Sequence, residues 1–142
     1  MKLKTFTLKE ANKLIPIVKN AFDDLFVLKK KIGIMKSEVD WIRDFWGKDM
    51  CDSDNPDGEK HDKLLLEVEK LYKEIKKKVI VLQKQGYVVK DVDNGLVDFY
   101  SFINNEPVFL CWQYGEKKIE YWHAIDGGFN GRRPITKINK IE

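Results

Sequence analysis

The sequence predicts an α+β protein in which a long N-terminal antiparallel helical hairpin, similar to a coiled coil, packs on a small C-terminal antiparallel β-sheet. Two observations predict the hairpin: apolar residues recur at alternating intervals of three and four in two segments, and a turn-forming stretch separates these segments. A third observation predicts the sheet: the C-terminal part of the chain contains three short runs rich in aromatic and β-branched side chains. We expect a hairpin over residues 1–86 and a sheet with a glycine-rich C-terminal loop over residues 87–142, packed as one structural unit.

The first helix is expected to begin at a capping box. Thr7 and Glu10 have the spacing at which each side chain accepts a hydrogen bond from the other residue's backbone N–H. Pro16 lies past the first turn, where it is expected to bend the helix or delay its start. The apolar positions then continue for about five heptads, which is typical of a coiled-coil seam. They are Ala11, Leu14, Val18, Ala21, Leu25, Leu28, Ile32, Met35, Val39, Ile42 and Trp46.

The second helix is expected over residues 62–85, and Gly86 stands where a helix ends in the left-handed conformation. Its apolar positions have the same spacing and are Leu65, Val68, Tyr72, Ile75, Val79 and Leu82. The connecting segment, residues 47–61, contains the turn-forming sequence Asn-Pro-Asp-Gly. At 1.5 Å per residue the first helix would be roughly 58 Å long and the second roughly 36 Å. The sheet must therefore cover the first turns of the first helix, residues 8–22.

Three strands are expected, over residues 96–103, 108–114 and 119–124, and a last strand is expected over residues 135–141. Asn104-Asn105 and residues 115–118 have the composition of tight hairpin turns. If both turns are tight, side-chain alternation assigns the residues to faces. The apolar face then contains Val97, Phe99, Ser101, Val108, Leu110, Trp112, Tyr114, Ile119, Tyr121 and His123. The mixed face contains Asp98, Tyr100, Phe102, Phe109, Cys111, Gln113, Glu120 and Trp122.

Composition and charge exclude several classes of protein. The chain has 142 residues, of which 43% are hydrophobic, which suits a single domain with a real core. It contains no run of about 20 apolar residues for a membrane span, and its start lacks the apolar stretch of a secretory signal. Its two cysteines are too few for a disulfide scaffold, so we expect a cytoplasmic protein. The net charge of +3 disfavours nucleic-acid binding as the main function.

The sheet segment contains the residues best suited to acid–base or metal chemistry. Catalytic candidates are His123, Glu116 and Asp98, and metal-ligand candidates are His123, Asp126 and Glu116. A metal site needs three or four ligands to converge, and the face assignment separates Cys111 from His123. A divalent metal is therefore not favoured, and the cofactor stays undetermined.

The mixed face has aromatic side chains, including Tyr100 and Trp122, which favour a dimer interface or a small pocket over RNA stacking. Arg132 could bind an anion or pair with a nearby carboxylate. The acidic segment 47–61 departs from the order of a calcium-binding loop, so we expect a solvated turn. The alternative is a tip that probes a basic channel or a metal ion in a partner.

Several motifs resemble the family known as domain of unknown function 2203. The resemblance begins with FTLKEANKLIP at residues 6–16 and is most specific at Gly86, at VKD (89–91) and at GLVDF (95–99). It continues through LCW (110–112), Gly115-Glu116, Ile119, Trp122-His123, Gly128-Phe129 and Gly131-Arg132. Membership implies a small bacterial or archaeal cytoplasmic protein with no established activity. This chain departs from the family pattern at Tyr100, where relatives usually have Pro, and in its longer loop between the helices. The residues inside the motifs that bear functional groups are Asp98, Cys111, Trp112, Glu116, Trp122, His123 and Arg132.

The leading functional expectation is a non-catalytic binding or interaction protein, with a protein partner or as a homodimer. Its binding residues would be found among Trp112, Trp122, Arg132, Tyr100 and Cys111. The alternative is a small metal- or acid–base-dependent enzyme centred on His123, Glu116 and Asp126. A second alternative is a factor associated with nucleic acid or RNA polymerase that uses the acidic tip. No membrane partner is expected.

Overall fold

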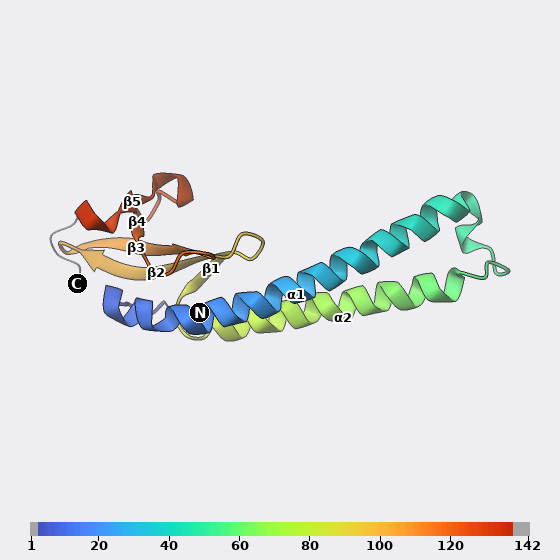
Figure 1. The fold of residues 1–142 in the computed structure, drawn as a ribbon, viewed down its shortest axis with the longest axis horizontal. Helices are drawn as coiled ribbons and strands as arrows, with labels where there is room; N and C mark the ends of the chain where they lie inside the picture. Colours follow the sequence, from blue (N-terminus) through green and yellow to red (C-terminus); the bar gives the residue numbers. More distant parts are fainter. Residues whose placement is uncertain (1–2, 138–142) are drawn as a thin grey trace. The chain divides into compact units, whose positions relative to one another are not determined.

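The computed structural model describes residues 3–137, and the α+β fold class predicted from the sequence is confirmed (Figure 1). Its helices are α1 (Leu8–Trp46) and α2 (Gly58–Gln83), with short 3₁₀ helices η1 (Gly47–Cys51), η2 (Phe129–Gly131) and η3 (Ile135–Lys137). Its strands are β1 (Val88–Asp91), β2 (Leu96–Ile103), β3 (Glu106–Gln113), β4 (Tyr121–Ala124) and β5 (Arg133–Pro134). The strands form one sheet in the order β1-β2-β3-β4-β5, and every neighbouring pair is antiparallel.

The chain forms two compact units. The first contains the residues up to Asp23 and those from Val79 onward, and the second contains Asp24–Lys78. No helix in the described part of the chain is long and apolar enough to cross a membrane.

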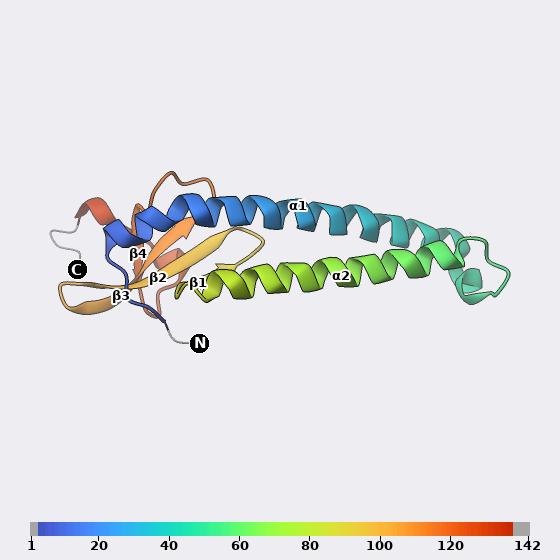
Figure 2. The ribbon, with the colours of Figure 1, turned by 90° about the horizontal axis from the view of Figure 1, so that it is seen from below.

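In the first unit, the opening turns of α1 cover one face of the sheet (Figure 2). The predicted capping box is confirmed, since Thr7 Oγ1 accepts from the Glu10 N–H at 3.1 Å and Glu10 Oε1 accepts from the Thr7 N–H at 3.2 Å. Phe22 lies against Trp112, with ring centroids 6.2 Å apart and both side chains fully buried. The Tyr114 hydroxyl donates to Asp23. The expectation that the sheet covers the first turns of this helix is confirmed.

The residues before α1 are hydrogen-bonded to the sheet unit. The Lys4 N–H donates to the Gly86 carbonyl at 3.1 Å, and the Phe6 N–H donates to the Tyr100 carbonyl in β2 at 2.8 Å. The buried Ser101 hydroxyl donates to the Phe6 carbonyl at 2.6 Å. The edge of β2 is thus paired with β1 in its first half and bonded to the N-terminal segment in its second half.

Two predicted turn positions are confirmed. Helix α2 ends at Gln83 rather than at the expected residue 85, and Gly86 closes the turn that follows it, with φ +102° and with a Cβ there lying 2.5 Å from the Cβ of Lys4. Asn104 and Asn105 both have positive φ, 52° and 67°, which is the conformation of a two-residue type I′ hairpin. This turn sets the register of β2 and β3, with Ile103 opposite Glu106.

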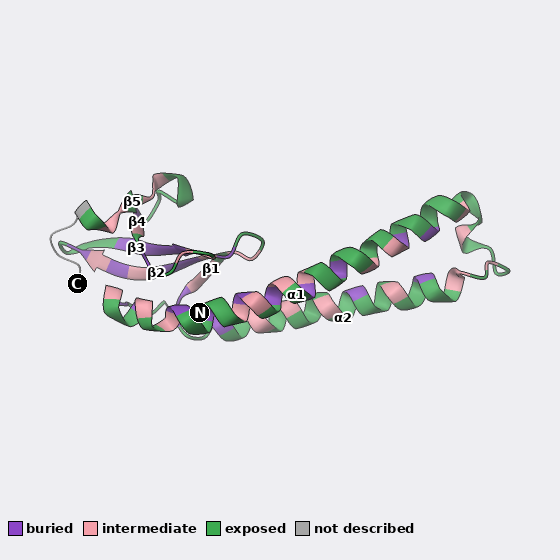
Figure 3. Cartoon of the chain, viewed as in Figure 1, coloured by how far each residue is buried: buried purple, intermediate pink, exposed green. Residues whose placement is uncertain are grey.

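In the second unit, α1 and α2 pack together along the predicted seam. Buried residues recur at seam positions while most other positions are exposed (Figure 3). They are Leu25, Leu28, Ile32, Val39, Ile42 and Val68. The helix α2 begins at Gly58 rather than at the expected residue 62. At the tip, the Arg43 Nε–H donates to the Nε2 atom of His61 at 2.8 Å, and the Trp46 indole donates to Asp57 at 2.9 Å.

The predicted assignment of β4 to faces is wrong. Side-chain alternation predicts His123 on the apolar face and Trp122 on the mixed face, but β4 pairs with β3 through Phe109–His123 and Leu110–Trp122. Directly paired residues share a face, so His123 lies on the face of Cys111, and Trp122 lies on the other. The reason is the connection after β3, which is longer than the tight turn expected over residues 115–118 and changes the register by one residue.

The sheet also differs from prediction at its two edges. The strands β1 and β5, of four and two residues, are absent from the sequence-based prediction. The strand expected over residues 135–141 is instead a 3₁₀ helix over Ile135–Lys137, and the remainder of that range lies outside the described residues.

Candidate metal centre

Three potential ligands come together on one face of the sheet, which we call the site face. Asp98 in β2 is the direct cross-strand partner of Cys111 in β3, and His123 in β4 lies diagonally from Cys111 on the same face. A carboxylate oxygen of Asp98, the Cys111 sulfur and a ring nitrogen of His123 all lie within 4.8 Å of one another. The residues are 2%, 1% and 2% exposed. The sequence-based separation of Cys111 from His123 is therefore corrected.

The hydrogen bonds of His123 define the orientation of its ring. Nδ1 lies 2.7 Å from the carbonyl oxygen of Ala124, which can only accept, so Nδ1 carries a hydrogen. Nε2 points in the opposite direction and lies 3.0 Å from Oδ2 of Asp98. The Gly127 N–H also donates to the Ala124 carbonyl at 2.9 Å, so this carbonyl ties the loop after β4 to the histidine. Nε2 is thereby directed towards the acidic and sulfur ligands.

The Cys111 thiol is not prepared for attack as a nucleophile. Burial raises its pKa from 9.0 to about 12, with a further contribution from the neighbouring Asp98 carboxylate. Both ring nitrogens of His123 already face other oxygens, so neither is available as the general base that a cysteine nucleophile requires. A thiol next to a carboxylate and an imidazole is instead a set of ligands suited to a metal cation, whose charge deprotonates the sulfur.

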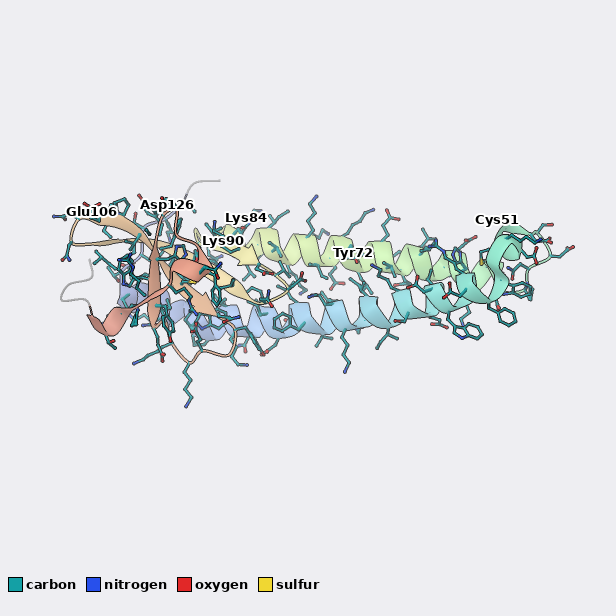
Figure 4. The ribbon with its side chains drawn as sticks, turned by 90° about the horizontal axis from the view of Figure 1, so that it is seen from above. Cys51, Tyr72, Lys84, Lys90, Glu106 and Asp126 are labelled. Carbon is teal, nitrogen blue, oxygen red and sulfur yellow. The ribbon has the colours of Figure 1, made fainter. Side chains whose placement is uncertain are left out.

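A cavity of about 280 Å³ opens on the three residues. Its other walls come from β1, the start of β2 and the loop after β4, and include Lys90, Leu96, Ile125, Asp126, Gly128 and Phe129. Lys90 and Asp126, both exposed, are labelled in Figure 4. The Nζ atom of Lys90 lies 5.7 Å from the ring centroid of Phe109, which neighbours Cys111 on the site face. The cavity therefore combines buried ligands with one cationic and one acidic side chain.

Glu116 and Arg132 lie outside this group and bind each other. Arg132 Nη2 lies 2.7 Å from Oε1 and 3.0 Å from Oε2 of Glu116, and it also donates to the Cys111 carbonyl at 3.2 Å. The guanidinium carbon lies 4.2 Å from the ring centroid of Tyr121 and 4.8 Å from that of Phe129. This arrangement holds the loop after β4 against the strand that carries Cys111. Arg132 already has a carboxylate partner and is poorly placed to bind a substrate anion.

The remaining predicted binding residues are spread over both faces. Trp112 is fully buried on the apolar face, and its indole donates to the Glu116 carbonyl at 2.9 Å. Trp122 is on the same side of the sheet, with the Arg133 guanidinium carbon 5.4 Å from its ring centroid. Tyr100 is half-buried on the site face beside Phe109, at 5.8 Å between centroids. Trp112 and Trp122 therefore lie on the apolar face, whereas Tyr100, Cys111 and the guanidinium of Arg132, which stacks on Tyr121, lie on the site face.

Sequence reasoning named Asp98, Cys111, His123 and Asp126, but it missed Lys90 and the convergence of the three ligands. The signal for Lys90 was weak, because Lys90 lies at the β-bulge in the pairing of β1 with β2, which the sequence does not predict. The convergence depends on the length of the connection between β3 and β4, which sets the face on which His123 lies.

Comparison with known proteins identifies a family but no activity. A family model described as "Uncharacterized conserved protein (DUF2203)" matches residues 4–135. Searches of the curated proteins and of the solved structures gave no significant match.

Proposed function

We propose, on the premise that the chain belongs to the uncharacterised DUF2203 family, that it is a small metal-dependent enzyme. Asp98, Cys111 and His123 hold one zinc-class divalent ion, and the remaining coordination position faces the cavity. The observation that carries this proposal is the convergence of three ligand atoms of different chemistry within 4.8 Å, all on buried residues.

The chemistry of the ligands supports zinc. Thiolate, imidazole and carboxylate are the three ligand types that zinc combines, whereas magnesium and calcium prefer oxygen alone. Zinc bonds of about 2.0–2.3 Å put the ligand atoms of a tetrahedral site roughly 3.5 Å apart. Small side-chain rotations bring atoms that already lie within 4.8 Å to this spacing. A thiolate ligand also suits the reducing cytoplasm, where we expect the protein to function.

The surroundings of the ligands support the same assignment. Histidines that bind metals usually donate their other ring N–H to a carbonyl or carboxylate, and Nδ1 of His123 does so to Ala124 at 2.7 Å. The hydrogen bond from Arg132 to the Cys111 carbonyl holds the strand that carries the sulfur. The ligand set therefore has a supporting shell built from the same sheet and loop.

The cavity supports a catalytic rather than a purely structural ion. Structural zinc sites have four protein ligands, whereas catalytic sites have three and leave one position for water or substrate. Zinc lowers the pKa of a bound water to about 7, which supports hydrolysis of a carbonyl or phosphoryl substrate. Asp126 lines the cavity and can accept a proton, and Lys90 lines it and can bind an anionic group of the substrate.

This proposal develops the enzyme alternative from the sequence and changes its residues. Cys111 and Asp98 join His123 as ligands, and Asp126 keeps an acid–base role. Glu116 leaves the site because it binds Arg132.

Metal analysis tests the site. Purified protein is stripped with a chelator, dialysed against zinc and measured by elemental analysis, and we expect one zinc per chain. His123→Ala and Cys111→Ser should abolish binding. The matched controls, His61→Ala and Cys51→Ser, change the chain's other histidine and other cysteine and should leave it intact. Cobalt-substituted protein should have a thiolate-to-cobalt charge-transfer band that Cys111→Ser removes. A band that survives Cys111→Ser, or zinc below stoichiometry in the unmodified chain, would overturn the site.

Activity tests the catalytic part separately. The zinc-loaded protein should hydrolyse p-nitrophenyl acetate or p-nitrophenyl phosphate, with loss on chelation and recovery on adding zinc. Asp126→Asn should lower kcat while zinc stays bound. Stoichiometric zinc without any zinc-dependent turnover of either ester would contradict the hydrolytic function and leave the metal site standing.

A further inference from the structure

The helix α1 has a second apolar stripe within the second unit, separate from the seam that packs on α2. Val27, Ile34, Trp41 and Phe45 are 54%, 61%, 63% and 65% exposed. Their spacing of seven, seven and four residues puts them along one side of the helix. Adjacent seam positions such as Leu28 and Ile42 are instead 7% and 2% exposed. Four large apolar side chains in one row on a helix are typical of a surface that packs against another helix.

The aromatic side chains at the distal end of this stripe contact one another. The rings of Trp41 and Phe45 are stacked, with centroids 5.5 Å apart and planes 11° apart. Phe45 also contacts Trp46 edge-on at 5.3 Å, and Trp46 is fixed by its hydrogen bond to Asp57 at 2.9 Å. Ordered aromatic side chains lose little conformational freedom on binding, so this surface is suited to a specific contact.

We propose that the occupant of this stripe is a second copy of the same chain, packed antiparallel about Ile34. The charges beside the stripe support this choice. Lys31 lies beside the stripe three residues before Ile34, and Glu38 lies on the same side four residues after it. Two antiparallel copies related by a two-fold axis put Lys31 of each next to Glu38 of the other, and Val27 next to Trp41. A parallel pair would instead put this flank of the two copies on opposite sides of the interface, so Lys31 and Glu38 could not pair.

Glu38 can make this contact while keeping its own partner. Its carboxylate accepts from Lys60 of the same chain at 2.6 Å, and its side chain is still 39% exposed. An ionised carboxylate has several acceptor sites, so one oxygen can serve Lys60 while the other faces Lys31 of the second copy. The intrachain ion pair orients the carboxylate before the second copy arrives.

Sedimentation velocity and light scattering of the full chain test the dimer. We expect the unmodified protein to be a dimer, and Trp41→Glu to be a monomer with unchanged helix content by circular dichroism. Leu66→Glu is the matched control, because Leu66 is 59% exposed on the other helix and should leave the dimer intact. A monomeric unmodified protein, or a dimer that survives Trp41→Glu, would overturn the proposal.

Charge exchange tests the antiparallel orientation. Lys31→Glu and Glu38→Lys should each raise the dimer dissociation constant by about tenfold or more. Glu38→Lys also puts two lysines together within the chain, because Glu38 binds Lys60, so the charge exchange is completed with Lys60→Glu. The triple variant Lys31→Glu/Glu38→Lys/Lys60→Glu restores the complementary pairs in an antiparallel dimer and should return the constant close to its original value. Failure of the triple variant to recover would refute the orientation. His123→Ala should remain dimeric, because this surface lies in the other unit from the candidate metal centre.

Discussion

His123 Nε2 and Asp98 Oδ2 lie 3.0 Å apart inside the sheet unit, and both residues are only 2% exposed. The two residues are far apart in sequence and come together only through the pairing of β2, β3 and β4. A buried polar pair of this kind is costly to form, but it is far more costly to leave half-formed.

Removing one member of this pair should therefore strongly destabilise the metal-free protein. Asp98→Ala leaves His123 Nε2 without its partner, and we expect the free energy of unfolding to fall by about 3–5 kcal/mol. Asp98→Leu combined with His123→Phe replaces both groups with apolar ones and should cost much less. Urea denaturation of chelator-treated protein measures both values. Equal losses in the single and double variants would show that the pair is not coupled.

Two glycines should respond to alanine in opposite directions. Gly33 lies within α1, and a Cβ added there would have nothing within 4 Å, so Gly33→Ala should raise the free energy of unfolding by about 0.5–1 kcal/mol. Gly86 has φ +102° and its added Cβ would meet the Lys4 side chain at 2.5 Å, so Gly86→Ala should lower it by about 2 kcal/mol or more. Thermal or urea unfolding of each variant provides the comparison, and a change of the same sign at both sites would contradict it.

Tyr87 should make the protein less stable in alkaline solution. Burial raises its pKa from 10.0 to about 12. Below pH 10 the phenol is neutral in both the folded and the unfolded chain. Between pH 10 and 12 only the unfolded chain loses its proton, so the free energy of unfolding should fall by roughly 2–3 kcal/mol across this window.

Tyr87→Phe should lack this part of the alkaline loss. The measurement is the difference between the variant and the unmodified chain in urea unfolding at pH 9 and pH 12. Tyr72→Phe is the control, because Tyr72 is 49% exposed. Parallel losses in the Tyr87→Phe and unmodified chains would show that this phenol does not titrate as expected.

The two cysteines should differ in reactivity. Cys51 is exposed, whereas Cys111 is 1% exposed and burial raises its pKa to about 12. A thiol-reactive disulfide reagent should therefore modify one thiol in the native metal-free protein and two after denaturation. In Cys51→Ser the native protein should not react. Rapid modification of that variant would mean that the site face opens readily to solvent.

Much of the fold could be predicted because the local sequence motifs and the requirement to bury the apolar face of α1 favour the same structure. The capping box at Thr7, the turn that Gly86 closes after α2 and the turn at Asn104-Asn105 each depend on a few adjacent residues. The covering of the first turns of α1 follows from a length mismatch between two helices, which simple geometry reveals. The short strands β1 and β5 have too few residues to give a pattern, and their pairing depends on neighbours distant in sequence.

The candidate site was harder to predict because it depends on which face of the sheet each side chain of β4 occupies. A one-residue error in the connection between β3 and β4 moves every side chain of β4 to the opposite face. That error separated His123 from Cys111 and hid the set that includes Asp98. Glu116 was a candidate because of its residue type, but its ion pair with Arg132 keeps it out of the ligand set. The residue types therefore identified the candidate ligands, but the sequence did not predict the register of β4 against β3 that brings them together.

The hydrogen bond from Phe6 to β2 also bears on how the protein avoids aggregation. Unpaired strand edges invite extra strands from other molecules, and here the residues ahead of α1 occupy the half of the β2 edge that β1 leaves free. Shortening the chain past Phe6 would expose that backbone and also the carboxyl-terminal part of a strand rich in aromatic residues. The segment from Lys4 to Phe6 thus covers part of this strand edge, and an expression tag added before it should leave the backbone hydrogen bonds of Lys4 and Phe6 intact.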